Sequence, residues 1–337
     1  MRRRLVLAAA AATVALPAAT AGAATSYPES TDYPITNLRA TDPQSGLTPC
    51  STRYEQVAHP VPEADKPVEE AIKQAFNPSQ AWALGETLAV VTEPEGDPLD
   101  PADQPVIRVK FPQNPTGTAG DVAPRAGGGF LAPMFEGGAD RACLHYKVRF
   151  PDAFGFTNGG RLPGLYGGSA TTGANEQESG GFTLRTAWRE DGQGELVEYI
   201  VNGGADARYG LSVGSDRWMW DTGRWHTVEQ EVVLNEPGKP DGIARVWVDG
   251  QPMVEQTDIV FRQSGDTMID GLLFEVFFDD RKANISTPEE ERLYFTDIRL
   301  YAGGTGGQTA EERKQWGEGD GEGSGYGQET PQGGGDD

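Results

Sequence analysis

The sequence predicts an all-β protein whose strands form a two-sheet antiparallel sandwich. Its 337 residues include 45 glycines and 24 prolines, a composition that favours short strands joined by turns over a bundle of helices. Short segments of alternating apolar and polar residues follow one another along the chain, and no long helical pattern separates them. Consecutive strands without intervening helices are typical of sandwiches.

The strand pattern recurs from the middle of the chain onward. In chain order, the expected strands are 106–111, 142–150, 181–188, 195–201, 225–234, 243–248, 272–278 and 292–301. The turn Asp191-Gly-Gln-Gly194 predicts a hairpin between the third and fourth of these, and Asp249-Gly250 predicts a second tight turn. One short helix is expected from Lys66 to Phe76, with Pro67 in its first turn.

Residues 1–23 have the pattern of a secretory signal peptide. Three arginines precede an apolar run from Leu5 to about Ala19, and Ala21-Gly22-Ala23 resembles a cleavage site. The run is too short to span a membrane, and no later stretch is as apolar over a membrane-spanning length. We therefore expect a secreted, extracellular chain with no membrane partner; an uncleaved anchor is the alternative.

The mature chain divides into three expected parts. Residues 24–75 form a Pro- and Thr-rich N-terminal extension that carries most of the short helix. Residues 76–302 contain the strands and form the main domain. Residues 303–337 are Gly-rich and acidic, so they cannot bury enough apolar surface to fold and are expected to be a disordered tail.

Charge and composition exclude several classes of partner. The chain has 28 Lys and Arg against 51 Asp and Glu, a net charge of −23, which makes nucleic acid an unsuitable partner. Two cysteines and three histidines leave little material for a zinc cluster, and we expect no metal and no cofactor. We expect the protein to be a monomer.

The two cysteines predict a disulfide. In an oxidising compartment, two lone cysteines usually pair, so Cys50 and Cys143 would tie the N-terminal extension to the main domain. Two buried free thiols are the alternative.

A motif in the second half of the chain refines the fold class. Residues 223–253 read GRWHTVEQEVVLNEPGKPDGIARVWVDGQPM, an amphipathic strand followed by a strand that ends in a tight turn. Concanavalin-like β-jelly rolls often show this pattern. Lectins, glycan hydrolases and glycan lyases share that architecture, so the motif indicates carbohydrate but not catalysis.

A Gly-rich segment resembles a known enzyme family. Residues 156–168, FTNGGRLPGLYGG, are similar to an element of the polysaccharide lyase family 14 alginate lyases and the related glucuronan lyases. The resemblance continues in FTLRTAWREDGQGELVEY at 182–199, in LLFEVFFDD at 272–280 and in LYFTDIRLY at 293–301, and upstream in VIRVKFP at 106–112. It covers roughly residues 76–301.

The resemblance implies a lyase that cleaves a β-1,4-linked polyuronate, such as glucuronan or mannuronate-rich alginate, by β-elimination. The partner is then an acidic polysaccharide. A base must remove the proton on C5, and a cation or hydrogen-bond donor must stabilise the charge that develops on the neighbouring carboxylate. An arginine and a tyrosine can supply these roles if the cation lowers the tyrosine pKa.

Matched residue by residue, the resemblance gives the expected site. Arg185 stands at the family's strand arginine, Tyr199 at the second of two tyrosines, and Thr183 where the family has a serine. Arg161 stands where the alginate lyases have a lysine, and Val197 replaces the first tyrosine. We expect Arg185 and Arg161 to bind the uronate carboxylate and Tyr199 to act as acid and base, with Thr183 assisting.

The departures at positions 161 and 197 concern specificity more than fold. A guanidinium stays charged at any working pH, so Arg161 can bind a carboxylate but cannot exchange protons as a lysine does. A non-catalytic concanavalin-like carbohydrate-binding protein is therefore the alternative function. A glycoside hydrolase would need two facing carboxylates, and Glu195 and Glu198 differ in strand parity.

Strand alternation predicts where the site lies. Thr183 and Arg185 should share one exposed, concave sheet face, while their neighbours pack in the core. Tyr199 joins that face only if the connecting loop has odd length, and the resemblance favours this arrangement. Three further residues are expected to bind substrate: Tyr166, packed on a turn at 162–165, and Lys147 and Arg149, which would extend a locally basic groove in an acidic protein.

Overall fold

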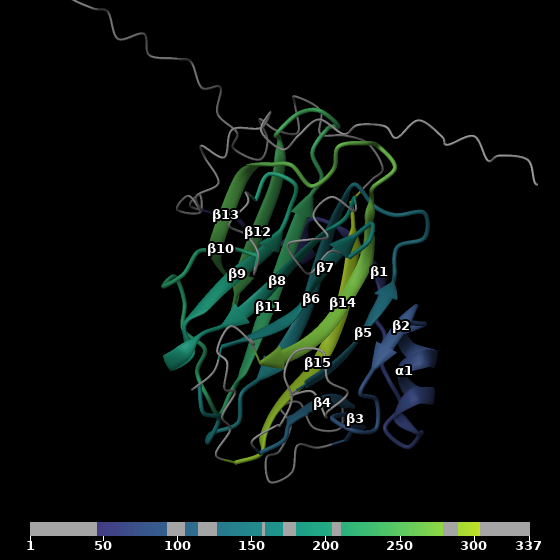
Figure 1. Cartoon of the computed structure of the whole chain (residues 1–337), viewed down its shortest axis with the longest axis vertical. Coiled ribbons are helices and arrows are strands. Elements are labelled where there is room, and N and C mark those ends of the chain that lie inside the picture. The colour runs from purple at the N-terminus through teal and green to yellow at the C-terminus, as the bar shows by residue number, and fades with distance from the viewer. Residues whose placement is uncertain are drawn as a thin grey trace, which may run out of the picture.

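Two antiparallel sheets packed face to face make up the described part of the chain (Figure 1). The computed structural model describes residues 46–92, 105–113, 127–156, 159–170, 180–203, 210–278 and 289–303. The expected signal peptide at 1–23, the first part of the extension and the expected tail from 304 onward lie outside these residues. Within the described ranges, no helix is long and apolar enough to cross a membrane.

Sheet A has eight strands and sheet B has seven. Sheet A runs in the order β13-β12-β11-β6-β15-β4-β3, with β1 also paired to β15. Its strands are β1 (Glu55–Ala58), β3 (Leu88–Val91), β4 (Val106–Phe111), β6 (Arg141–Arg149), β11 (Trp225–Val233), β12 (Gly242–Val248), β13 (Gln251–Ile259) and β15 (Glu291–Ala302).

Sheet B runs in the order β10-β9-β8-β7-β14-β5-β2. Its strands are β2 (Gln80–Trp82), β5 (Gly127–Pro133), β7 (Gly160–Gly167), β8 (Phe182–Trp188), β9 (Gly194–Tyr199), β10 (Leu211–Val213) and β14 (Ile269–Phe278). This arrangement confirms the predicted all-β sandwich of the jelly-roll type. The strands expected from alternation are all present, within about three residues at each end.

The strands that the sequence did not indicate are mostly short or poor in alternation. β1, β2, β3 and β10 span three or four residues each, which is too few to show a period of two. β5 begins with three glycines, and glycine carries no apolar signal. These strands form because neighbouring strands offer them unpaired backbone groups, as β14 offers to β5.

The core lies between the sheets and follows from strand alternation. On β6, Leu144, Tyr146 and Val148 are buried and point inward. The hydroxyl of Tyr146 lies 2.7 Å from Oγ1 of Thr186 on β8, so this contact joins the inner faces of the two sheets. Rings from several strands pack together in the same layer, with Trp188 and Phe278 in edge contact.

The helix lies close to its expected position. α1 (Val68–Phe76) has Pro67 as its N-cap residue rather than inside the first turn, and it ends at Asn77 with a φ of 44°. Its apolar side packs on the edge of the sandwich, where the ring of Phe76 lies 4.7 Å from that of Phe130 on β5. Figure 1 shows the helix beside β2 and β3.

The tight turn predicted at Asp249-Gly250 is present. Val248 pairs with Gln251, so Asp249 and Gly250 form a two-residue hairpin loop. Both have positive φ angles, 51° and 76°, as the mirror-image turns of tight hairpins require. The sequence pair Asp-Gly therefore set this connection locally.

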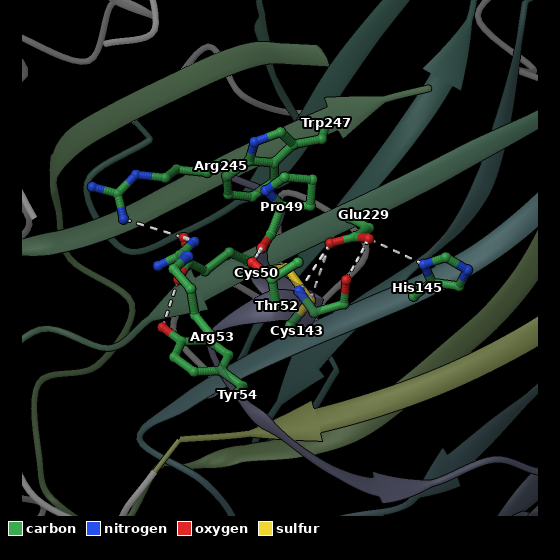
Figure 2. The surroundings of a disulfide bond; sticks show 12 residues. Pro49, Cys50, Thr52, Arg53, Tyr54, Cys143, His145, Glu229, Arg245 and Trp247 are labelled. Carbon is green, nitrogen blue, oxygen red and sulfur yellow. Dashed lines mark hydrogen bonds and ion pairs between the residues drawn. A yellow bond between two sulfur atoms is a disulfide. The ribbon is translucent and has the colours of Figure 1, made fainter. Parts of the chain in front are cut away.

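A disulfide fastens the N-terminal segment to the outer face of sheet A (Figure 2). Cys50 is bonded to Cys143 on β6, with 5.8 Å between their Cα atoms. Next to the bond, Ser51 donates its backbone N–H and its hydroxyl to Glu229 on β11, at 3.0 and 2.7 Å. Glu231, two residues further along β11, accepts hydrogen bonds from Arg53 at 2.9 Å and from Tyr54 at 2.5 Å.

Opposite charges compensate the burial of Glu231. Burial alone would raise the pKa of this carboxyl, but Arg245 and Arg53 outweigh that effect and hold the pKa below its usual value. Glu231 therefore stays ionised beneath the N-terminal segment. The buried ion pairs would each leave an uncompensated charge if one partner were removed.

Candidate active site

The predicted site residues of β8 and β9 lie on the side of sheet B that faces away from the core. Phe182, Leu184 and Trp188 point into the core, so Thr183 and Arg185 point outward. Tyr199 pairs directly with Thr183 across the two strands and therefore shares that outer face. The connection consists of residues 189–193, whose odd number gives the parity that the sequence had left open.

A bulge brings residues of β7 to the same face. Tyr166 pairs with Thr183, Gly164 with Arg185 and Arg161 with Ala187, so three steps along β7 match two along β8. Without this irregularity, Arg161 and Tyr166 would point to opposite faces, because they are five positions apart, an odd number. The bulge thus places both on the outer face of sheet B.

The Gly-Leu-Pro segment is a strand, which corrects the expected turn at 162–165. β7 runs through the middle of sheet B, between β8 and β14, and all its residues are buried. Leu162 and Leu165 are part of the core. The glycines hide the strand in the sequence because they carry no side chain to alternate.

Gly164 is needed at its position in β7. A Cβ atom there would lie 1.7 Å from the carbonyl oxygen of Leu184 on β8. β7 and β8 therefore approach each other more closely than any residue other than glycine at position 164 would allow. Because Gly164 pairs with Arg185, it also leaves room for the arginine side chain to cross β7.

Arg185 is held by residues of β14 on one side and of β9 on the other. Its Nη1 lies 2.5 Å from Oε2 of Glu275 on β14. Its guanidinium carbon lies 5.9 Å from the ring centre of Tyr199 and 5.4 Å from that of Phe277. Arginine and aromatic rings attract each other at such distances.

Glu275 is a site residue that the sequence reasoning missed. The signal was present, because in Leu272–Phe278 the acid alternates with residues of the core and pairs with Gly129 of β5 on the outward side. An acid flanked by apolar residues on a central strand points to a paired charge.

The predicted exposure of this face is wrong. Arg161, Thr183, Arg185 and Tyr199 are at most 4% exposed, so β7, β8 and β9 do not present an open surface. Partly or fully exposed positions lie at both edges of this face, over β14, β5 and β2 on one side and at Ser212 of β10 on the other. The Glu275 side chain is 21% exposed, so solvent reaches the partner of Arg185 on β14.

Tyr166 has a defined protonation state. Burial raises the pKa of its hydroxyl, and the nearby Asp270 carboxylate raises it further. The hydroxyl therefore stays protonated at neutral pH, when it can donate a hydrogen bond but cannot serve as a base.

The two acids of β9 lie on different sides of sheet B. Glu195 is on the outer face, opposite Ala187, and is bound by Arg189 and by the hydroxyls of Ser212 at 3.0 Å and Ser215 at 3.2 Å. Glu198 is fully buried and points into the core. They cannot act together across a cleft, as the parity of the strand predicted.

Lys147 and Arg149 do not extend the same groove, contrary to expectation. They alternate on β6 with Tyr146, whose hydroxyl reaches Thr186 in the core, so they point away from sheet B. Lys147 lies 3.9 Å from Asp297 on β15, and Arg149 is buried where β6 pairs with β11 and β15. The thickness of the sandwich separates both from Arg185.

The described residues offer one close group of potential metal ligands, formed by Cys50, Cys143 and Glu229. Both sulfur atoms belong to the disulfide, so they are not available as thiolate ligands. The group lies on the outer face of sheet A, away from Arg185 and Tyr199.

Comparison with models of known protein families gives one match, which covers more than half of the chain. Residues 100–298 match the family model for polysaccharide lyase 14. The chain belongs to this family. The matched residues begin before β4 and end within β15. They include Arg161, Thr183, Arg185, Tyr199 and Glu275 on the outer face of sheet B.

Solved structures with the same fold include other polysaccharide lyases. A marine alginate lyase of this family from Aplysia kurodai is 24% identical, with a TM-score of 0.60 over 74% of this chain and 99% of that chain. The alginate lyase Aly36B, solved with an alginate trisaccharide, is 19% identical, with a TM-score of 0.57 over 74% and 100%.

An endo-β-1,4-glucuronan lyase from the fungus Trichoderma reesei is 10% identical, with a TM-score of 0.50 over 74% of this chain and 96% of that chain. A search of curated protein sequences returned no match to this lyase. These similarities show a shared fold, and the family assignment rests on the matched residues.

Proposed function

We propose that this lyase is secreted and cleaves a β-1,4-linked polyuronate by β-elimination. The single observation that carries the proposal is the buried guanidinium of Arg185 against the ring of Tyr199. Arg161, Thr183 and Tyr166 share their sheet face. A permanent cation beside a phenol is the minimal set for binding a uronate carboxylate and moving a proton next to it.

In the proposed reaction, Arg185 and Arg161 bind the carboxylate attached to C5. Their positive charge stabilises the negative charge that builds up on the carboxylate when the C5 proton leaves. Tyr199, as phenolate, accepts that proton, and the freed electron pair forms the C4–C5 double bond while the C4–O4 bond breaks. Tyr199 then returns a proton to O4, so no water is consumed.

The proposed substrate class follows from the fold neighbours and from the two arginines. The neighbours are described as alginate lyases and a glucuronan lyase, all of which act on polyuronates. Arg161 and Val197 stand at the positions where this chain departs from the alginate lyase pattern. These departures argue against strict specificity for alginate, so glucuronan and mannuronate-rich alginate are the polymers to be tested side by side.

Export is supported by the sequence of residues 1–23 and by the disulfide. A bond such as Cys50–Cys143 persists in oxidising compartments. Secretion would also bring the enzyme to its polymer, because polyuronates are too large to enter a cell intact.

The test is the ultraviolet absorbance of the unsaturated uronate during incubation with glucuronan, polymannuronate and polyguluronate separately. A rise with one polymer identifies the lyase reaction and its substrate, because hydrolysis forms no double bond. The matched variant Arg185→Ala should abolish the rise. Binding of a polymer without any rise would contradict the proposal and favour a carbohydrate-binding role.

A further inference from the structure

Arg185 uses one end of its guanidinium for a partner inside the protein. Nη1 lies 2.5 Å from Oε2 of Glu275, and the arginine is 1% exposed while the Glu275 side chain is 21% exposed. Glu275 belongs to β14, which is separated from β8 by β7. The side chain of Arg185 reaches it by passing over Gly164, where no side chain stands in the way.

Three groups define where the guanidinium sits. The ring of Tyr199 lies on one neighbouring strand, and Phe277 and Glu275 approach from β14. Nε of Arg185 is buried and has no hydrogen-bond partner among the described residues. A guanidinium binds a carboxylate side-on through Nε and Nη2, and this edge lies opposite Nη1.

We propose that Glu275 is a positioning residue: by accepting the Nη1 hydrogen bond, it turns the Nε edge of Arg185 toward the carboxylate of the bound uronate. This inference rests on the proposed function. Glu275 compensates the charge of the buried guanidinium. An acid in a site for a polyanion also weakens the attraction of the substrate, so charge compensation alone does not account for its place at Nη1. Fixing the guanidinium does, because a misplaced binding group costs about a hundredfold in rate.

Two substitutions separate position from charge. Glu275→Gln keeps an oxygen that accepts the Nη1 hydrogen bond, whereas Glu275→Ala removes it. We expect Glu275→Ala to lower kcat/KM about ten- to a hundredfold and Glu275→Gln to stay within about threefold of wild type. Glu290→Ala, which removes a surface acid next to Arg292 on the other sheet, is the matched control and should leave activity unchanged.

A direct measurement makes the test independent of activity. Side-chain NMR of ¹⁵N-labelled arginine reports rotation of the guanidinium about the Nε–Cζ bond. The Hη signals of Arg185 should be separately resolved in wild type and Glu275→Gln, and averaged in Glu275→Ala.

Three results would overturn the inference. They are Hη signals in Glu275→Ala that match wild type, full activity of Glu275→Ala, or equal losses in Glu275→Ala and Glu275→Gln. If the wild-type protein cleaves none of the polymers, the proposed function fails instead, and the NMR spectra still decide whether Glu275 positions Arg185.

Discussion

Tyr199 combines a reactive hydroxyl with a ring that packs against a cation. If the hydroxyl moves the proton, Tyr199→Phe should lower kcat by at least about a hundredfold, since general acid–base catalysis contributes roughly that much. The ring that contacts Arg185 remains in this variant, so substrate binding should change little. Initial rates and the thermal midpoint measured on the same samples check this.

The control for that prediction is Tyr294→Phe. Tyr294 is buried on the outer face of sheet A, where β15 pairs with β6, and it lies far from the proposed site. Its removal should leave the rate unchanged. Similar losses in both variants would mean that the effect is a general loss of folding.

A second prediction for a single residue concerns Glu198 and the way the free energy of unfolding depends on pH. Burial raises the pKa of this carboxyl to about 8, and Gln256 opposes the shift only in part. In the unfolded chain the group ionises near pH 4.3, as an ordinary Glu does. Between these two pH values the folded state holds a proton that the unfolded state has lost, so rising pH favours unfolding.

Glu198→Gln should therefore stabilise the protein at pH 8 and leave it nearly unchanged at pH 4. The gain should grow by about 1.4 kcal/mol per pH unit between these limits and become constant above the folded pKa. Urea unfolding at several pH values measures it. A gain that is the same at pH 4 and pH 8 would show that Glu198 does not titrate in this range.

At the scale of elements, the contact between β7 and β8 depends on one missing side chain. A Cβ at Gly164 would meet the carbonyl oxygen of Leu184 at 1.7 Å, and backbone atoms of a central sheet cannot move aside. We expect Gly164→Ala to lower the free energy of unfolding by about 3 kcal/mol and to reduce activity through Arg185. Chemical denaturation and rate measurements test both effects.

Gly265→Ala is the matched control for that change. A Cβ at Gly265 would meet no atom within 4 Å, and this glycine has no positive φ. The variant should have wild-type stability and activity. An equally small effect at Gly164 would mean that β7 and β8 can separate without cost.

At the scale of the whole molecule, the disulfide joins segments 93 residues apart. Cross-links of this kind stabilise mainly by restricting the unfolded chain, typically by about 2–4 kcal/mol. The N-terminal segment also supplies Ser51 to Glu229 and Arg53 to Glu231. Replacing both cysteines by serine should therefore lower the thermal midpoint and expose these acids.

The reference for this prediction is the wild-type protein under reducing conditions. Reduction should lower the midpoint of wild type to that of the double variant and should not affect the variant itself. If oxidised and reduced wild type unfold at the same temperature, the hydrogen bonds of the N-terminal segment hold it in place without the cross-link.

Much of this architecture could be predicted because local pattern and environment agree. Leu144, Tyr146 and Val148 alternate with polar residues and form one inner face, and Asp249-Gly250 closes a hairpin by its own backbone preferences. β7 could not be predicted in this way, because a strand of glycines, a proline and a bulge shows no period of two. Its form is imposed by β8 and β14 on either side.

The sequence by itself determined the all-β class, the long strands, the short helix and the outward direction of Thr183 and Arg185, because these depend on residue spacing within one segment. It also carried the motifs by which the family was identified. Only the tertiary structure decided that Lys147 and Arg149 lie across the sandwich from Arg185, that the site face is buried, and that Glu275 meets Arg185 at 2.5 Å. Such facts depend on which strands become neighbours, and strand order is set by contacts between residues far apart in the chain.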